Sequence, residues 1–113
     1  VAYRLALDHP GRVTKLALLD ILPTFFVWRQ IEAGSFPAAH WGFLAQPFPQ
    51  PESEIARDPV PYFEGLMGKW SNSELKPFHP AARAAYRESF TVPERIHAMC
   101  EDYRAVLPHR QGH

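Results

Sequence analysis

The chain has 113 residues, one cysteine, and twelve basic and twelve acidic side chains that cancel to a net charge of zero. Scattered, balanced charge does not form the basic surface that attracts nucleic acids or anionic membranes, so we expect neither as a partner. A single cysteine cannot form an internal disulfide, and no apolar run approaches the roughly 18 residues of a membrane span. We therefore expect a cytoplasmic protein.

The first 23 residues predict a piece of an α/β fold. Residues 1–9 read as the end of a helix that Pro10-Gly11 stops. Residues 15–22 form a short apolar run of the kind found in strands buried on both faces of a parallel sheet. Such runs also occur in buried helices, but the order helix, turn, apolar run favours the α/β interpretation.

A lone parallel strand leaves its backbone groups unsatisfied on both edges. We therefore expect its neighbours to lie outside these residues. The first helix also starts without a cap, which agrees with an internal piece of a larger protein.

The rest of the chain predicts helices separated by prolines. Apolar residues recur at helical spacing in each segment, and proline or glycine separates one segment from the next. We expect an extended, stiff segment over residues 47–51, where three prolines occur. The expected helices cover residues 24–33, 36–45, 52–57, 62–70, 81–90 and 93–107.

The common catalytic and binding motifs are absent from the sequence. It contains no Gly-x-Ser-x-Gly elbow, no Gly-x-Gly-x-x-Gly and no phosphate-binding loop. His97 and Cys100 are three residues apart, but two ligands do not make a zinc site, so we expect no metal. Cys100 lies in an apolar stripe of the last helix, which predicts a buried packing residue rather than a nucleophile.

Asp20 is the first candidate site residue. It ends the apolar run, and catalytic groups of open α/β sheets gather at the carboxyl ends of strands. An aspartate in this place can orient a histidine base and stabilise it when protonated. The alternative is that Asp20 hydrogen-bonds the turn around Pro23.

His40 and Trp41 form a pair of N–H donors that could stabilise an anion in a dry pocket. The alternative is a core tryptophan beside a half-buried histidine. Tyr103 falls in the buried stripe of the last helix, where its hydroxyl needs a partner, either a ligand or a backbone carbonyl. Trp70 could wall a pocket or fill a core.

Four strings of the sequence are similar to α/β-hydrolases of the fluoroacetate (haloacetate) dehalogenase group. They are VAYRLALDHP at 1–10, KLALLDILPT at 15–24, HW with FLAQP at 40–47, and CEDYRA at 100–105. The first two are shared in part with epoxide hydrolases, whereas the other two are more specific to the dehalogenases. The resemblance runs in order from residue 1 to about residue 105.

The resemblance implies a mechanism without cofactor or metal. In this family an aspartate displaces halide from the α-carbon of a haloacetate, and a histidine-activated water hydrolyses the resulting ester. Asp20 matches the acid that orients the histidine. His40, Trp41 and Tyr103 match the halide-binding donors of the cap, and Trp70 matches a substrate-pocket tryptophan.

The resemblance also implies a domain organisation. Residues 1–23 match the hydrolase core and residues 24–107 match the helical cap, while residues 108–113 form an atypical tail. The family's nucleophile and base match no residue of this chain, so we expect the chain alone to be inactive. The parent enzyme would act on a small haloacid as a homodimer.

Two other functions stay open at this point. An epoxide hydrolase would use a pair of cap tyrosines, of which Tyr103 could be one, to polarise the epoxide oxygen. A small helical binding module without catalysis would unfold cooperatively by itself. The uncapped start and the lone strand argue against such a module.

Overall fold

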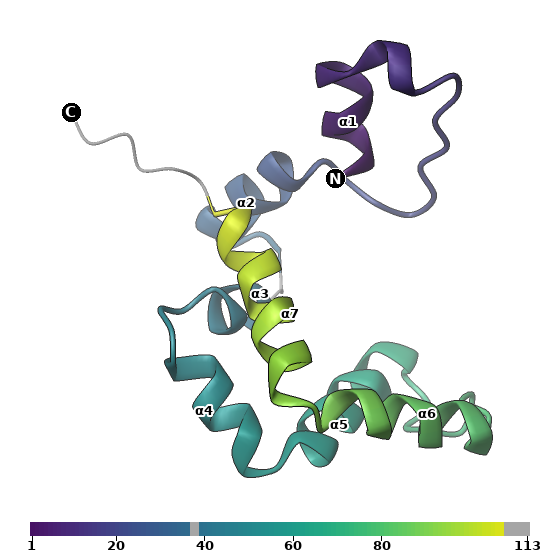
Figure 1. The fold of residues 1–113 in the computed structure, drawn as a ribbon, viewed down its shortest axis with the longest axis vertical. Coiled ribbons are helices and arrows are strands. Elements are labelled where there is room, and N and C mark those ends of the chain that lie inside the picture. The colour runs from purple at the N-terminus through teal and green to yellow at the C-terminus, as the bar shows by residue number, and fades with distance from the viewer. Residues whose placement is uncertain (37–38, 108–113) are drawn as a thin grey trace. The chain divides into compact units, whose positions relative to one another are not determined.

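The computed structural model describes residues 1–36 and 39–107, which form helices joined by loops (Figure 1). The described residues divide into two compact units, residues 1–36 and residues 39–107. No helix in either described range combines the length and the apolar character of a membrane span. The tail that the sequence marks as atypical, residues 108–113, lies outside the described residues.

The first unit contains α1 (Ala2–Asp8), a 3₁₀ turn η1 (Pro10–Arg12) and α2 (Thr24–Glu32). The helix predicted over residues 1–9 is thus confirmed. Pro10 sits at the first position of the 3₁₀ turn, where its missing N–H costs no hydrogen bond.

Gly34 ends α2 as the sequence predicts. Its φ is 70°, a left-handed conformation that glycine adopts without steric cost. The N–H of Gly34 donates to the carbonyl of Ile31 at 3.0 Å, and the N–H of Ser35 donates to that of Gln30 at 2.9 Å. These two bonds form a Schellman motif, which satisfies carbonyls that the end of the helix would otherwise leave open.

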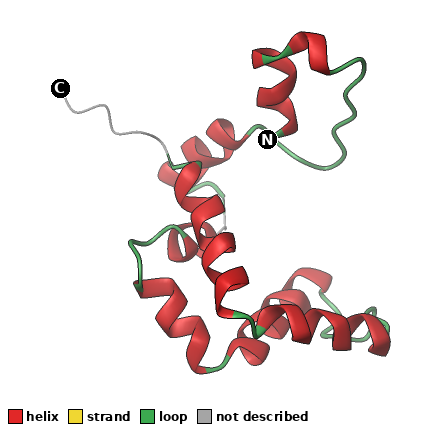
Figure 2. Ribbon diagram, in the orientation of Figure 1, coloured by secondary structure: helices red, strands yellow, loops and turns green. Residues whose placement is uncertain are grey.

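The strand predicted over residues 15–22 is not formed. Figure 2 shows only helix and loop in the described residues, and this segment is a loop whose apolar side chains are exposed. A strand needs a neighbour for its N–H and C=O groups, and no described residue pairs with this segment. The apolar pattern identifies a segment suited to a buried sheet, but it cannot supply the neighbouring strands.

The second unit contains five helices among its described residues. Three of them begin with proline, because the first helical turn needs no N–H donor and proline already has a helical φ. The helices predicted over residues 52–57, 62–70, 81–90 and 93–107 are confirmed, with ends that shift by a few residues. The helix predicted over residues 36–45 is found over residues 39–44, and residues 37 and 38 lie outside the described residues. The helices are α3 (Ala39–Leu44), α4 (Gln50–Arg57), α5 (Pro59–Ser71), α6 (Pro80–Phe90) and α7 (Pro93–Ala105).

The extended segment predicted over residues 47–51 is partly wrong. Residues 48 and 49 form a turn, and Gln50 and Pro51 already belong to α4. Pro51 occupies the first turn of this helix, where proline is tolerated, and its side chain is buried. Proline density therefore indicated stiffness here but did not exclude a helix start.

One apolar core holds the second unit together, and α7 lies at its centre. This helix packs against α3, α4 and α6, and Figure 1 shows it running alongside α4. The core joins five buried side chains from four helices: Leu44, Ile55, Phe63, Ile96 and Cys100. Cys100 is fully buried, as predicted, and burial raises the pKa of its thiol to about 11.

An ion-pair cluster ties α5 to α6. The carboxylate of Glu64 accepts from Arg87 Nε at 2.6 Å and Nη2 at 3.2 Å, and from Arg83 Nη2 at 3.3 Å. These hydrogen bonds outweigh desolvation and lower the pKa of Glu64. The predicted boundary between residues 1–23 and residues 24–107 stays a prediction.

Candidate functional site

Four side chains predicted as site residues meet in the second unit. The ring centroid of His40 lies 5.1 Å from that of Trp70, 6.0 Å from that of Tyr103 and 6.4 Å from that of Trp41. Trp41 and Tyr103 are 5.6 Å apart, and all four pairs meet edge to face. We call these four residues the aromatic cluster.

Three helices supply the aromatic cluster. His40 and Trp41 are consecutive on α3, Trp70 is one residue from the end of α5, and Tyr103 lies on α7. His40, Trp41 and Tyr103 are half-buried, whereas Trp70 is 59% exposed. The cluster is therefore a partly open site at which three packed helices converge.

The loop after α5 is folded tightly where Trp70 leaves the helix. Asn72 adopts a left-handed φ of 51°, and the hydroxyl of Ser71 donates to the carbonyl of Glu74 at 2.6 Å. A Cβ on Gly68 would lie 3.4 Å from the backbone of Glu74, so this turn folds back over the last helical turn. These local bonds fix the end of α5 beside His40.

Burial sets the protonation state of the cluster. Burial, with the positive charge of Lys69, lowers the pKa of His40, so its imidazole is neutral at pH 7. Burial, with the negative charge of Asp102, raises the pKa of Tyr103, which keeps its hydroxyl protonated. The cluster therefore offers neutral N–H and O–H donors, and Lys69 adds a positive charge beside them.

The hydroxyl of Tyr103 has no hydrogen-bond partner within residues 1–36 and 39–107. The backbone carbonyl that the sequence left open as its partner is therefore not found there. A neutral imidazole, an indole N–H and a phenol hydroxyl can together hold a small anion by hydrogen bonds.

Asp20 lies in the first unit. It is exposed, and its φ of 51° places it in the left-handed region, which asparagine and aspartate enter more readily than most residues. The alternative hydrogen bond to the turn around Pro23 does not occur within the described part of the chain. Strained backbone of this kind gathers at functional sites.

A second group of polar residues lies on α4 and α7, and the sequence alone did not reveal it. Arg104 Nη2 donates to the carboxylate of Glu52 at 2.7 Å, and Arg104 also pairs with Glu101. His97 Nδ1 lies 2.9 Å from Glu52 Oε1. We call Glu52, His97, Glu101 and Arg104 the arginine clamp.

The clamp contains three groups of metal-ligand type. Ligand atoms of Glu52, His97 and Glu101 lie within 4.8 Å of one another. The guanidinium of Arg104 already binds both carboxylates and supplies the positive charge that a cation would bring. Burial raises the pKa of Glu52, but the hydrogen bonds from Arg104 and His97 outweigh it and lower that pKa overall. The set is an ion-pair cluster.

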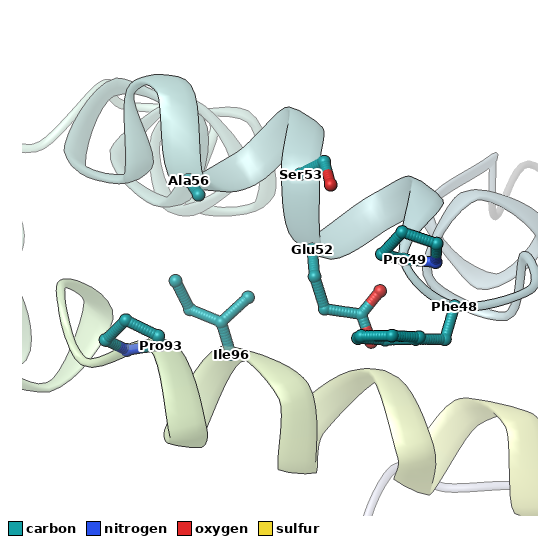
Figure 3. Close-up of a pocket in the computed structure, with 7 residues that line it drawn as sticks. All are labelled: Phe48, Pro49, Glu52, Ser53, Ala56, Pro93 and Ile96. Carbon is teal, nitrogen blue, oxygen red and sulfur yellow. The ribbon is translucent and has the colours of Figure 1, made fainter.

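A shallow pocket of about 260 Å³ lies between α4 and α7. Figure 3 shows the two helices with Ile96 and Glu52 pointing into the space between them. The walls of the pocket are mainly apolar. None of the four aromatic-cluster residues lines it. The lining residues are Phe48, Pro49, Glu52, Ser53, Ala56, Pro93 and Ile96.

The chain is similar to proteins of the α/β-hydrolase class. It is 40% identical over 104 residues to a fluoroacetate dehalogenase from Burkholderia sp, a match that covers 91% of this chain and 34% of that protein. No family model matches the chain. The chain thus spans about a third of the length of this relative.

Solved structures also show similarity to α/β-hydrolases over about a third of their length. A candidate epoxide hydrolase mutant from Pseudomonas aeruginosa with bound MFA superposes with a TM-score of 0.83 at 38% identity, over 93% of this chain and 36% of the other. A candidate α/β-hydrolase from Nostoc sp PCC 7120 gives 0.81 at 48% identity, over the same shares of the two chains. The predicted fold class is confirmed, because the helices match the cap region of α/β-hydrolases.

Proposed function

We propose that this chain forms part of an enzyme that hydrolyses the carbon–halogen bond of a small haloacid. The proposal is supported by the homology of the chain to a fluoroacetate dehalogenase and by the cap region that it shares with the α/β-hydrolases. The observation that carries the proposal is the convergence of His40, Trp41 and Tyr103 in one half-buried cluster. Tyr103 is 63 positions from His40 and 62 from Trp41 in the sequence, so only the fold brings it to them.

The chemistry follows from the donors of the aromatic cluster. In the first step a carboxylate oxygen forms a bond to the α-carbon while the carbon–halogen bond breaks, and the halide leaves with the electron pair. Negative charge develops on the halogen, where N–H and O–H donors stabilise it most. Water then adds to the ester, losing its proton to a histidine, and releases the hydroxyacid and the free carboxylate.

Asp20 is the acid that orients this histidine in our proposal, and Trp70 forms a wall of the substrate pocket. The nucleophile and the base come from segments that this chain does not match. We further propose that the reaction uses no cofactor or metal, that the enzyme is a cytoplasmic homodimer, and that the 113-residue chain alone does not turn over.

A halide-selective electrode tests the proposal. The full-length enzyme that contains this chain should release fluoride from fluoroacetate, and the 113-residue chain at equal concentration should not exceed the blank. Fluoride release by the chain alone would contradict the division of catalytic groups. No release by the full-length enzyme would contradict the assigned reaction.

Epoxide hydrolysis is a second candidate reaction, because one of the similar solved structures is that of a candidate epoxide hydrolase. A cluster tyrosine can donate to an epoxide oxygen as well as to a halide. The two reactions separate in one comparison, in which the full-length enzyme is given fluoroacetate or a small epoxide. Faster diol formation than halide release would favour the second candidate.

A further inference from the structure

Arg104 joins three segments of the second unit through one side chain. Its Nε donates to the backbone carbonyl oxygen of Gln46 at 2.8 Å, Nη2 donates to the carboxylate of Glu52 at 2.7 Å, and Nη1 donates to Glu101. Gln46 follows α3, Glu52 lies in the first turn of α4, and the other two residues are on α7. Every nitrogen of the guanidinium therefore has an acceptor.

The clamp is linked to the aromatic cluster through α7 and α3. Tyr103 precedes Arg104 on α7, while His40 and Trp41 lie on the helix whose C-terminal end Arg104 holds through Gln46. That helix, α3, has six residues, well below the roughly 12 to 15 that an isolated helix needs. Its position must therefore come from contacts with its neighbours.

The Arg104–Glu52 pair of the clamp is also largely removed from water. The side chains of Arg104 and Glu52 are 14% and 12% exposed, whereas that of Glu101 is 52% exposed. A planar guanidinium can serve the carbonyl and both carboxylates at fixed angles. A lysine ammonium keeps the charge but cannot reproduce this fork.

We propose that Arg104 is a positioning residue for halide binding: by holding α7 to the end of α3 and to α4, it sets the donors of Tyr103, His40 and Trp41 around one anion. This inference rests on the proposed function, because it takes the aromatic cluster as the halide site. Arg104 itself does not touch the halide. The same side chain also keeps the charge of Glu52 compensated beside the site.

Bromide titration of the 113-residue chain tests the proposal, since bound bromide quenches tryptophan emission. Sulfate keeps the ionic strength constant, and circular dichroism checks the helices. We expect saturable quenching for the wild type and about tenfold weaker binding for Arg104→Lys, as expected for donors misplaced by a fraction of an ångström. Tyr103→Phe, which removes a direct donor, should also weaken binding.

Arg87→Lys is the matched control. This substitution breaks the bidentate hydrogen bonding between Arg87 and the carboxylate of Glu64 but changes no residue of the aromatic cluster. We expect bromide binding within about twofold of the wild type. Equal losses in Arg87→Lys and Arg104→Lys would overturn the positioning role, because both would then act through general stability.

A fluorine resonance provides a readout independent of bromide. In chain labelled with 5-fluorotryptophan, Trp41→Phe identifies the Trp41 signal, which senses the rings of Tyr103 and His40. Arg104→Lys should shift this signal and Arg87→Lys should not. An unmoved signal in folded Arg104→Lys, or unchanged bromide binding, would overturn the inference.

Two further outcomes stay decisive. If the wild-type chain shows no saturable quenching, the proposal that the aromatic cluster binds halide is overturned. The fluorine signal then decides by itself whether Arg104 positions Trp41. If Arg104→Lys does not fold, Glu52→Gln takes its place, since the amide keeps an acceptor for the guanidinium but loses the charge. A shifted Trp41 signal in Glu52→Gln then supports the role, and an unshifted signal overturns it.

Discussion

Asp20 combines an exposed carboxylate with a left-handed backbone, and this combination allows a clean substitution. Asparagine tolerates a φ of 51° as well as aspartate does, so Asp20→Asn changes the charge without disturbing the turn. We expect turnover of the full-length enzyme to fall by about 10³ to 10⁴, as when a histidine base loses its orienting acid. Fluoride release under saturating fluoroacetate measures the loss.

Asp58→Asn is the control for this substitution. Asp58 is exposed and makes no side-chain cap bond at the start of α5, so its loss of charge should leave turnover within about twofold of the wild type. If Asp20→Asn retains more than a tenth of the wild-type rate, Asp20 does not orient the base.

Cys100 gives a second prediction at the scale of single residues. Its thiol is fully buried in the core of the second unit, and burial raises its pKa to about 11. At pH 8 we expect Ellman's reagent to label the folded chain at least about 100-fold more slowly than the denatured chain, because both access and thiolate are scarce. Equal rates would show that this core is not formed in solution.

The site residues differ in how far the sequence could identify them. His40, Trp41 and Tyr103 carry donors in apolar surroundings, and short strings around them resemble a known family, so they could be proposed without a structure. Arg104 could not, because its partners Gln46 and Glu52 are 58 and 52 positions away and nothing local marks them. Ion pairs of this kind depend on how helices pack.

At the scale of elements, proline explains both what was predicted and what was not. Pro59, Pro80 and Pro93 begin helices, and the last of these starts was predicted to the residue. Helix α4 begins at Gln50, with Pro51 in its first turn, inside a segment that its proline content marked as extended. The strand expected over residues 15–22 failed for another reason, because strand formation requires neighbours that a local pattern does not contain.

The helices of the second unit also depend on two carboxylates for their stability towards acid. Hydrogen bonds from Arg87 and Arg83 lower the pKa of Glu64, and those from Arg104 and His97 lower the pKa of Glu52. A folded-state pKa below the unfolded value gives stabilisation that is present above the unfolded pKa, near 4.5. That stabilisation is lost as the pH falls from there through the lowered folded-state pKa.

Chemical denaturation between pH 6 and pH 2.5 measures this effect. Glu64→Gln and Glu52→Gln should each lower stability at pH 6 and reduce the proton uptake on unfolding by up to about one proton. Glu88→Gln, an exposed control on α6, should follow the wild-type curve. Parallel curves for all four proteins would show that these ion pairs do not couple to folding.

At the scale of the molecule, the chain supplies two different parts of the proposed reaction. The first unit carries Asp20 and an exposed apolar segment, and the second carries the aromatic cluster on its own core. The chain spans about a third of its dehalogenase relative, so the nucleophile and base must come from the rest of such an enzyme in our account. The central claim is that the aromatic cluster receives the leaving halide.

The leaving group tests this claim most directly. Fluoride concentrates its charge and accepts strong hydrogen bonds, so loss of a donor should slow its departure more than that of bromide. We predict that Tyr103→Phe lowers turnover of the full-length enzyme about 100-fold with fluoroacetate but only about tenfold with bromoacetate. The control Tyr86→Phe, on an exposed tyrosine of α6, should change neither rate. Equal losses with the two substrates would contradict halide binding by the aromatic cluster.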